Sequence, residues 1–226
     1  MTGKKINEIT ALLPMKAHSS RVKGKNFRNF NGKPLYQWIL GTLLSIEMID
    51  RIVINTDAKP ILNDLGLPSS EKLVVRERKP EICGDEVSMN LVLKDDVENT
   101  DSDHYLMTHT TNPLLSAQTI KSAIETYQTE KCDSLFTVNR YQTRFYDQQG
   151  KPINHSPKNL IPTQDLEPWF EENSNLYIFE RDAFLETKSR IGLNPVLFET
   201  PKQESIDIDE EEDWDLAEII MKAKIS

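Results

Sequence analysis

The chain has 226 residues, a formal net charge of −9, 38% hydrophobic residues and two cysteines. This length fits one domain, residues 1–226, with room for a sheet covered by helices on both faces. A net charge of −9 argues against general nucleic-acid binding, which would need a basic face, and no apolar run approaches the roughly 18 residues that span a membrane. Because the N-terminus lacks a signal-peptide core and Cys83 and Cys132 lack metal-ligand spacing, we expect a cytoplasmic protein with two reduced thiols.

The first informative stretch is a basic loop, residues 14–35, between the apolar run 9–13 and a helical pattern that starts at Tyr36. No acidic residue occurs between Glu8 and Glu47, whereas the same interval has six Lys and Arg residues. A loop between a buried strand and a helix lies at the strand's carboxyl end, where open α/β sheets bind ligands. Backbone N–H groups and cationic side chains there suit a triphosphate. A solvated basic surface loop is the alternative.

The chain then alternates between helical and strand patterns. The apolar spacing predicts helices at 34–49, 58–65, 87–98 and 116–130, and strands at 51–57, 72–75, 104–107 and 134–138. Strands and helices that alternate with short connections form the repeat of a parallel sheet, so we expect an α/β fold. Periodicity weakens at about residues 139–172, where turn signals and prolines interrupt longer elements, and an insertion of this length is usually functional.

The last informative stretch is acidic, with nine carboxylates in residues 204–218. Asp207 and Asp209 alternate with isoleucines, which predicts a strand that has both carboxylates on one face and both isoleucines buried on the other. Two adjacent carboxylates suit Mg²⁺, which takes one or two carboxylates together with substrate phosphates. The alternative is an acidic helix N-terminus that complements the helix dipole, and we assign residues 210–215 to that structure.

The basic loop resembles the first motif of the acylneuraminate cytidylyltransferases, the CMP-sialic acid synthetase family. That motif reads roughly P-A-R-x-x-S-K-G-x-x-x-K-N followed by G-K-P-L. The loop keeps the motif at Pro14, Ser19, Lys25, Asn26 and residues 32–35, whereas Lys16 stands at the family arginine and Ser20-Arg21 replaces Lys-Gly. The resemblance implies a CTP-binding loop whose nucleotide-binding residues include Lys16, Ser19, Lys25 and Asn26. It also implies that Lys16, Arg21 and Lys25 stabilise the departing pyrophosphate.

Further matches follow in the family's order. Residues 78–85 resemble R-P-x-x-L-A-x-D, and the resemblance implies that Arg78 lies against the cytosine ring; a mixed-charge surface turn is the alternative. Residues 108–115 resemble L-L-Q-P-T-S-P-L, with His109 in place of the glutamine near the acceptor sugar. Asp207 and Asp209 match the family's D-I-D, which supports a magnesium site there.

In the resembling family, the insertion that corresponds to residues 139–172 projects as an arm and packs against a second subunit. We therefore expect a homodimer. Near the end of the arm, the family pattern R-Q-x-L-P followed by N-G-A-I-Y implies acceptor-binding roles for Gln164 and Asn173. Thr163 replaces the family arginine and Ser174-Asn175 replaces Gly-Ala, so the departures fall on the acceptor side.

The resemblance covers nearly the whole chain. It implies a Rossmann-like three-layer α/β/α nucleotide-diphospho-sugar transferase fold with a mixed, mostly parallel sheet. The implied reaction combines CTP with a nonulosonic, sialic-acid-like 2-keto-3-deoxy sugar acid, with Mg²⁺, to give the CMP-sugar and pyrophosphate. Two alternatives remain open: a different acceptor such as a 3-deoxy-octulosonate, or a nucleotide-binding module without turnover. The P-loop, dinucleotide-binding and nucleophile-elbow motifs are absent from the sequence, which argues against kinase, dehydrogenase and hydrolase chemistry.

Overall fold

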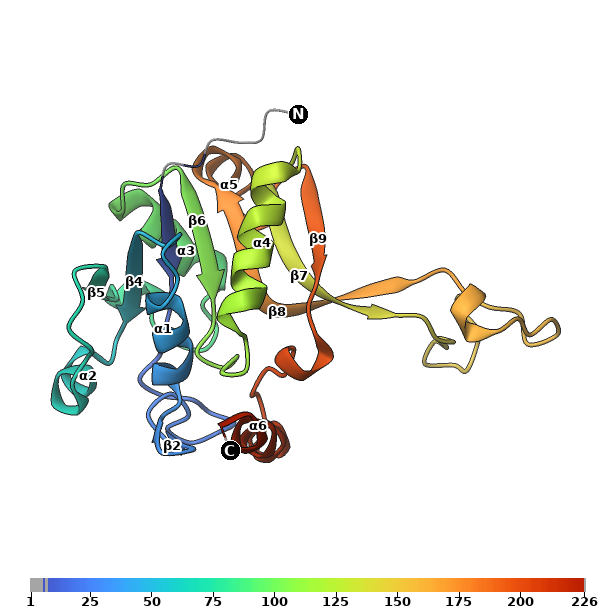
Figure 1. Cartoon of the computed structure of the whole chain (residues 1–226), viewed down its shortest axis with the longest axis horizontal. Coiled ribbons are helices and arrows are strands. Elements are labelled where there is room, and N and C mark those ends of the chain that lie inside the picture. The colour runs from blue at the N-terminus through green and yellow to red at the C-terminus, as the bar shows by residue number, and fades with distance from the viewer. Residues whose placement is uncertain (1–5, 7, 226) are drawn as a thin grey trace.

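A seven-stranded sheet forms the centre of the computed structural model, which describes residue 6 and residues 8–225 (Figure 1). In spatial order its strands are β5 (Leu73–Glu77), β4 (Arg51–Thr56), β1 (Ile9–Leu12), β6 (His104–Thr108), β8 (Trp169–Glu180), β7 (Ser134–Tyr141) and β9 (Pro195–Glu199). Neighbouring strands are parallel except at β8, which is antiparallel to both β6 and β7. The mixed, mostly parallel sheet expected from the sequence is confirmed.

Helices cover both faces of this sheet. One face packs against α1 (Tyr36–Leu44), α2 (Lys59–Leu65) and α4 (Ala117–Thr129), and the other against α3 (Met89–Asn99) and α5 (Arg181–Thr187). Strand alternation explains the two cores, because Ile9 and Ala11 of β1 join the first cluster and Leu12 joins the second. Helices of 7–13 residues are marginal in isolation, so burial against the sheet stabilises them.

A third apolar cluster attaches the last helix to the basic loop. Helix α6 (Glu211–Ile225) buries Trp214, whose ring meets the ring of Phe30 edge-on at 5.2 Å. Phe30 is held by a small hairpin of β2 (Asn29–Phe30) and β3 (Lys33–Pro34). The hairpin turn is Asn31-Gly32, with φ of 47° and 96°, as a two-residue turn with both φ positive requires. The loop at one end of the sequence is thus shaped by the helix at the other.

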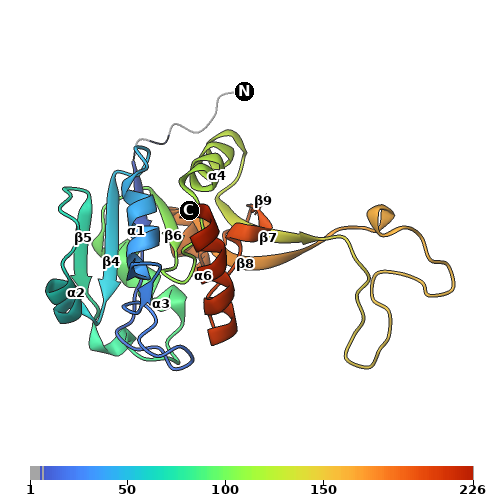
Figure 2. The same cartoon turned by 60° about the horizontal axis from the view of Figure 1, so that its bottom comes forward.

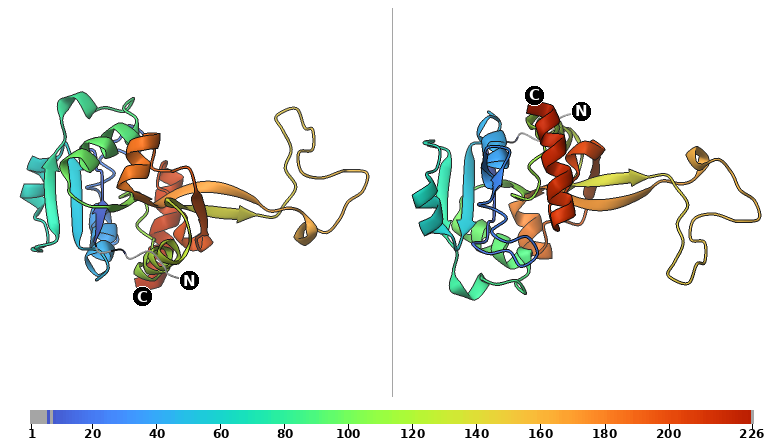
Figure 3. Two further views of the ribbon diagram at one scale, coloured as in Figure 1. Left: turned by 90° about the horizontal axis from the view of Figure 1, so that it is seen from above. Right: turned by 90° about the horizontal axis from the view of Figure 1, so that it is seen from below.

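Residues 139–172 leave the sheet as a long hairpin arm (Figures 1 and 2). The pairing of β7 with β8 continues out to Tyr141 opposite Trp169, and the 3-10 turn η2 (Thr163–Asp165) lies further out. The arm has exposed large apolar side chains at Tyr141, Tyr146, Ile153, Leu160, Ile161, Trp169 and Phe170. Figure 3 shows from above and below that the arm extends well beyond the three-layered body. The arm's projection is confirmed; its role in dimerisation stays a prediction.

Most predicted elements exist, with bounds that differ by a few residues. The largest correction concerns residues 206–209, where the predicted strand is wrong. These residues form a loop between the 3-10 turn η3 (Lys202–Glu204) and α6, because the backbone N–H of Ile208 donates to the Thr111 carbonyl at 3.0 Å instead of pairing in the sheet. Helix α5, strand β9 and the 3-10 turn η1 (Pro80–Ile82) were not predicted. No helix in the described part of the chain is long and apolar enough to cross a membrane.

Candidate active site

A cleft of about 360 Å³ lies at the carboxyl end of the parallel strands. It is lined by Pro14, Lys16, His18, Ser19, Ser20, Arg21, Lys25, Asn26, Asp85, Met89, His109, Thr110, Thr111, Ser174, Asp207 and Asp209. The basic loop, the end of β6, β8 and the loop before α6 thus contribute to one cavity. All the site residues predicted from the sequence line it except Arg78, Gln164 and Asn173.

Asn26 fixes the shape of the basic loop. Its Nδ2 donates to the Lys16 carbonyl at 2.8 Å, and its Oδ1 accepts from the Thr110 hydroxyl at 2.6 Å. The start of the loop is held by a second bond, from the Ala17 N–H to Oδ1 of Asp57 at 2.6 Å. The loop is therefore fastened to the ends of two strands, β4 and β6, before any ligand binds.

The three predicted cations each face a carboxylate or a carbonyl group in the cleft. Lys25 is almost fully buried, and its Nζ donates to the Ile208 carbonyl and lies 3.4 Å from Oδ1 of Asp209. Arg21 is half-exposed and binds the same Asp209 oxygen at 2.8 Å. Lys16 reaches across the cleft to Asp85 at 3.1 Å. The basic loop is thus already linked by ion pairs to the acidic loop before α6.

Asp207 and Asp209 lie on either side of Ile208, whose side chain is buried in the third apolar cluster. Although this segment is not a strand, both carboxylates line the cleft as expected. Oδ1 of Asp207 is buried without a hydrogen-bond partner, and burial, reinforced by the neighbouring Asp209, raises the pKa of Asp207 above its usual range.

An unpartnered carboxylate oxygen beside a second carboxylate fits a hard cation such as Mg²⁺, which often takes only two ligands from the protein. In the described part of the chain no three His, Cys, Asp or Glu side chains gather as a cation site. Asp85 also lines the cleft but pairs with Lys16, so Asp207 and Asp209 are the adjacent carboxylates that a cation could use there.

Arg78 lies behind the cleft wall, and the structure does not support its expected contact with a base. Its guanidinium donates to Oδ1 and the carbonyl of Asn55, at 3.0 and 2.8 Å, and to the carbonyl of Met15 at 3.4 Å. Since Met15 directly precedes Lys16, Arg78 fastens the entry to the basic loop onto the end of β4. Arg78 is thus placed as a buried support for the loop.

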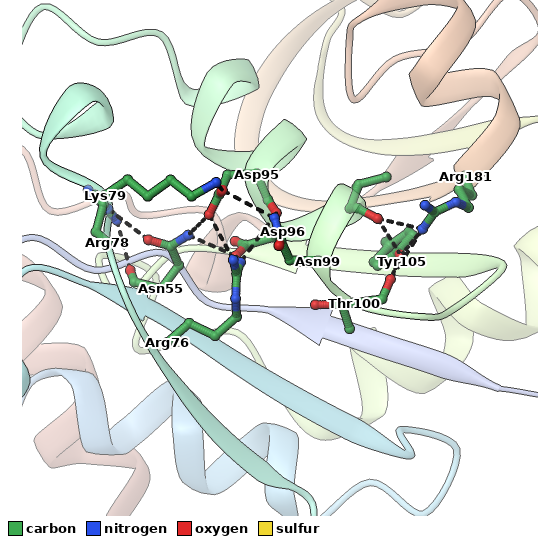
Figure 4. A network of polar contacts seen from close by, with 11 residues as sticks. Asn55, Arg76, Arg78, Lys79, Asp95, Asp96, Asn99, Thr100, Tyr105 and Arg181 are labelled. Carbon is green, nitrogen blue, oxygen red and sulfur yellow. Dashed lines mark hydrogen bonds and ion pairs between the residues drawn. The ribbon is translucent and has the colours of Figure 1, made fainter.

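A buried polar network continues from Arg78 into α3 (Figure 4). Nδ2 of Asn55 donates to Asp96 at 2.8 Å, and Arg76 forms ion pairs with both Asp95 and Asp96. Asp96 is fully buried, one of its oxygens has no partner, and burial raises its pKa to about 6. The network links α3, which contributes Met89 to the cleft, to the strands beneath the basic loop.

The three predicted acceptor-binding residues lie in different places. His109 lines the cleft, and burial together with Arg190 and Lys25 lowers its pKa to about 3. Gln164 is exposed on the arm, outside the cleft, and its carbonyl accepts from Gln142. The amide of Asn173 is fully engaged: it donates to Asn139 and Thr200 and accepts from the N–H of Asn175. Of the three, only His109 can meet a ligand in this cleft.

Sequence reasoning missed a polar group that lies against His109 at the cleft wall. Nη1 of Arg190 lies 3.5 Å from Nε2 of His109, its Nη2 binds Glu172 at 3.2 Å, and its guanidinium stacks 3.7 Å over the ring of Tyr177. The Tyr177 hydroxyl donates to the same Glu172 carboxylate. Arg190 lies in a loop without a motif, so no pattern in the sequence indicated its role.

The cations and carboxylates thus face each other at the carboxyl ends of the parallel strands, where open α/β sheets bind their ligands. The chain belongs to the cytidylyltransferase family, whose sequence model matches residues 10–223. The resemblance noted in the sequence is therefore confirmed.

Several relatives match along most of this chain. It is 25% identical to the post-translational flagellin modification protein B of Campylobacter coli, over 97% of both chains. It is 28% identical to the CMP-N,N'-diacetyllegionaminic acid synthase of Legionella pneumophila, over 95% of this chain and 96% of that protein. The N-acylneuraminate cytidylyltransferase of Streptococcus agalactiae is 24% identical over 90% of this chain, which spans about half (51%) of that protein.

Solved structures support the fold. A CMP:2-keto-3-deoxy-manno-octonic acid synthetase complexed with CTP superimposes with a TM-score of 0.67 and 12% sequence identity, over 96% of this chain and 100% of that one. At this identity the likeness establishes the fold alone, and it confirms the Rossmann-like nucleotidyltransferase architecture expected from the sequence.

Proposed function

We propose that this protein transfers CMP from CTP to a nonulosonic, sialic-acid-like sugar acid and releases pyrophosphate. The observation that supports the proposal most is the meeting of Lys16, Arg21 and Lys25 with Asp207 and Asp209 across one cleft. Transfer of a nucleoside monophosphate from a triphosphate needs cations for the pyrophosphate leaving group and hard oxygen ligands for a metal, and this cleft offers both. The relatives named as synthases of CMP-activated nonulosonic acids support the choice of acceptor class.

In this reaction the anomeric hydroxyl oxygen forms a bond to the α-phosphorus while the bond to the β-phosphate oxygen breaks. The hydroxyl proton goes to solvent, and pyrophosphate takes the bonding electrons. Lys16, Ser19 and Lys25 bind the phosphates, and Arg21 stabilises the negative charge that grows on pyrophosphate. Asn26 keeps the loop in its binding shape.

Asp207 and Asp209 would hold Mg²⁺, which when bound polarises the α-phosphate. This assignment is supported by the unpartnered Oδ1 of Asp207. Arg21 and Lys25 pair with Asp209, so both cations would turn from this carboxylate to the phosphates if Asp209 held the metal.

We further propose a homodimer in which the arm binds the second subunit. The arm's exposed apolar side chains, among them Trp169 and Phe170, support this. The double variant Trp169→Ser and Phe170→Ser should sediment as a monomer at concentrations at which the parent is a dimer. A parent that is already a monomer, or a double variant that remains a dimer, would contradict the proposal.

The deciding test of the reaction is pyrophosphate release from CTP with Mg²⁺ and a panel of acceptors. The panel contains N-acetylneuraminic, pseudaminic and N,N'-diacetyllegionaminic acids and a 3-deoxy-octulosonate. Turnover with an acylated nonulosonic acid supports the proposal, and turnover with the octulosonate alone would move the protein to the first alternative. Binding of CTP without pyrophosphate release for any acceptor would favour the second alternative, a nucleotide-binding module.

A further inference from the structure

The cleft wall opposite the basic loop contains a residue in an unfavourable backbone conformation. Ser174 has a φ of 58°, in the left-handed region, and it lines the cleft. Non-glycine residues rarely adopt this conformation, and serine occupies the position where the resembling family has glycine. Strained positions that persist at a cleft are typical of residues that contribute to a site. The backbone bend at Ser174 coincides with the irregular pairing of β7 and β8, between Phe136 and Val138.

The hydroxyl of Ser174 lies beside the phenol of Tyr177, whose only proton is already engaged in a hydrogen bond. Oγ of Ser174 is 3.3 Å from the Tyr177 hydroxyl, which donates to Glu172. Burial raises the pKa of Tyr177, so the phenol stays protonated and keeps this bond. The Ser174 hydroxyl can therefore donate to the phenol oxygen and present its lone pairs, as an acceptor, to the cleft.

His109, which also lines the cleft, offers a hydrogen-bond donor where Ser174 offers an acceptor. Its Nε2 faces Nη1 of Arg190, and a guanidinium can only donate. The ring proton must then lie on Nδ1, so the imidazole is neutral and its remaining nitrogen is a donor. Glu172 and the stack on Tyr177 fix Arg190 in this position.

We infer that Ser174 and His109 recognise an uncharged acylamino substituent of the acceptor sugar acid, with Arg190 and Glu172 as positioning residues. An acylamino group has one N–H donor and one carbonyl acceptor, which match the acceptor of Ser174 and the donor of His109. Both side chains are neutral, whereas the sugar's carboxylate has the basic loop to meet. The inference rests on the proposed function, because it takes the acceptor to be a sugar acid.

The test measures acceptor binding separately from turnover. Calorimetry on protein loaded with a non-hydrolysable CTP analogue gives the Kd of N-acetylneuraminic and N,N'-diacetyllegionaminic acids, and of a 3-deoxy-octulosonate without acylamino groups. Ser174→Ala and Ser174→Gly should each weaken binding of an acylated acid about 3- to 10-fold, as expected for one neutral hydrogen bond. Binding of the CTP analogue should not change.

Thermal unfolding separates this role from a structural one. Ser174→Gly should raise Tm by about 2–4 °C, because glycine relieves the left-handed strain. The same variant should weaken binding of the acylated acid. Lys188→Gly is the matched control: Lys188 also has a positive φ, 56°, but is exposed at the end of α5. It should raise Tm similarly and leave acceptor binding unchanged.

Arg190 provides the second line of the test. Arg190→Met should weaken binding of the acylated acids about as much as Ser174→Ala does, although Arg190 does not line the cleft. Arg190→Lys, which can still donate to His109, should restore part of the loss.

The inference is overturned if no acylated acid binds the parent, or if the Ser174 variants bind these acids as tightly as the parent. It is also overturned if the variants weaken binding of the octulosonate as much as they weaken binding of the acylated acids. Failure of the proposed function has a different signature, the absence of pyrophosphate release by the parent protein with every acylated acid of the panel.

Discussion

Lys25 is the residue whose replacement tests the proposed phosphate site most directly. Lys25→Met keeps most of the apolar stem and removes the ammonium group, which donates to the Ile208 carbonyl and lies 3.4 Å from Asp209. If the ammonium group also binds the triphosphate, its loss removes a hydrogen bond between charged groups, about 1.5–3 kcal/mol. We therefore expect kcat/KM for CTP to fall by about 10- to 150-fold.

The structure adds a second expected effect, on stability. Because Lys25 is almost fully buried, its removal leaves the Ile208 carbonyl without this donor. The cost is about 1–3 kcal/mol of unfolding free energy, measurable by urea denaturation. Lys16→Met should lose a similar amount of kcat/KM but less than about 0.5 kcal/mol of stability, since the ion pair between Lys16 and Asp85 is solvent-exposed.

The control for both variants is Lys23→Met. Lys23 is exposed on the same loop and does not line the cleft, so its neutralisation should change neither quantity appreciably. Arg28 is a poorer control, because its guanidinium lies 4.2 Å over the Trp214 ring and pairs with Glu211 at 2.7 Å, which ties α6 to the loop. If Lys16→Met, Lys25→Met and Lys23→Met all changed kcat/KM by similar small factors, the loop would be a diffuse basic surface and the phosphate assignment would be wrong.

Three further predictions follow from the proposed metal-binding pair, from the proposed nucleotide and from the buried network. Asp209→Asn should abolish turnover and retain the fold; turnover within tenfold of the parent, about 1.4 kcal/mol in the barrier, would remove Asp209 from the metal shell. CTP should raise Tm more than ATP or GTP does, and equal stabilisation by all three would count against a cytidine site. Because burial raises the pKa of Asp96 to about 6, the native state holds this proton more tightly than the unfolded state between about pH 4 and 6. The free energy of unfolding of the parent, relative to that of Asp96→Asn, should therefore fall by about 2 kcal/mol from pH 4.5 to pH 7 in urea denaturation, and a rise would refute the assignment.

Local patterns were enough to predict most of the helices, the strands β1, β4, β5, β6 and β7, and the two ends of the candidate site, but not α5 or β9. Asp207 and Asp209 could be paired from sequence because residues two apart share a direction, and this relation survived although the segment is a loop. Lys16 and Lys25 could be chosen because the basic loop has no carboxylates of its own. In each case the relevant neighbours lie within a few residues along the chain.

The rest of the site depends on contacts between distant segments, which a single sequence does not reveal. Arg78 was expected in the cleft, but Asn55, which lies 23 residues earlier in β4, binds its guanidinium behind the cleft wall. Arg190 lies 81 residues from His109 and occurs in no motif. The replacement of a family glycine at Ser174 was visible in the sequence, yet only the backbone angle shows that this serine stays in the left-handed conformation.

The attachment of α6 to the basic loop sets the order in which the molecule can be completed during its synthesis. Arg28 and Glu211 are 183 residues apart, which corresponds to roughly 10–40 s of translation at typical rates. The last sheet strand, β9, ends at Glu199, so every strand of the sheet is made before the helix that holds Phe30 and Val22. A nascent chain that ends between these points can form the sheet while the basic loop still lacks its apolar support. The bonds of Asn26 and Ala17 to the ends of β6 and β4 can form before α6 is made, whereas the apolar support of Phe30 and Val22 cannot.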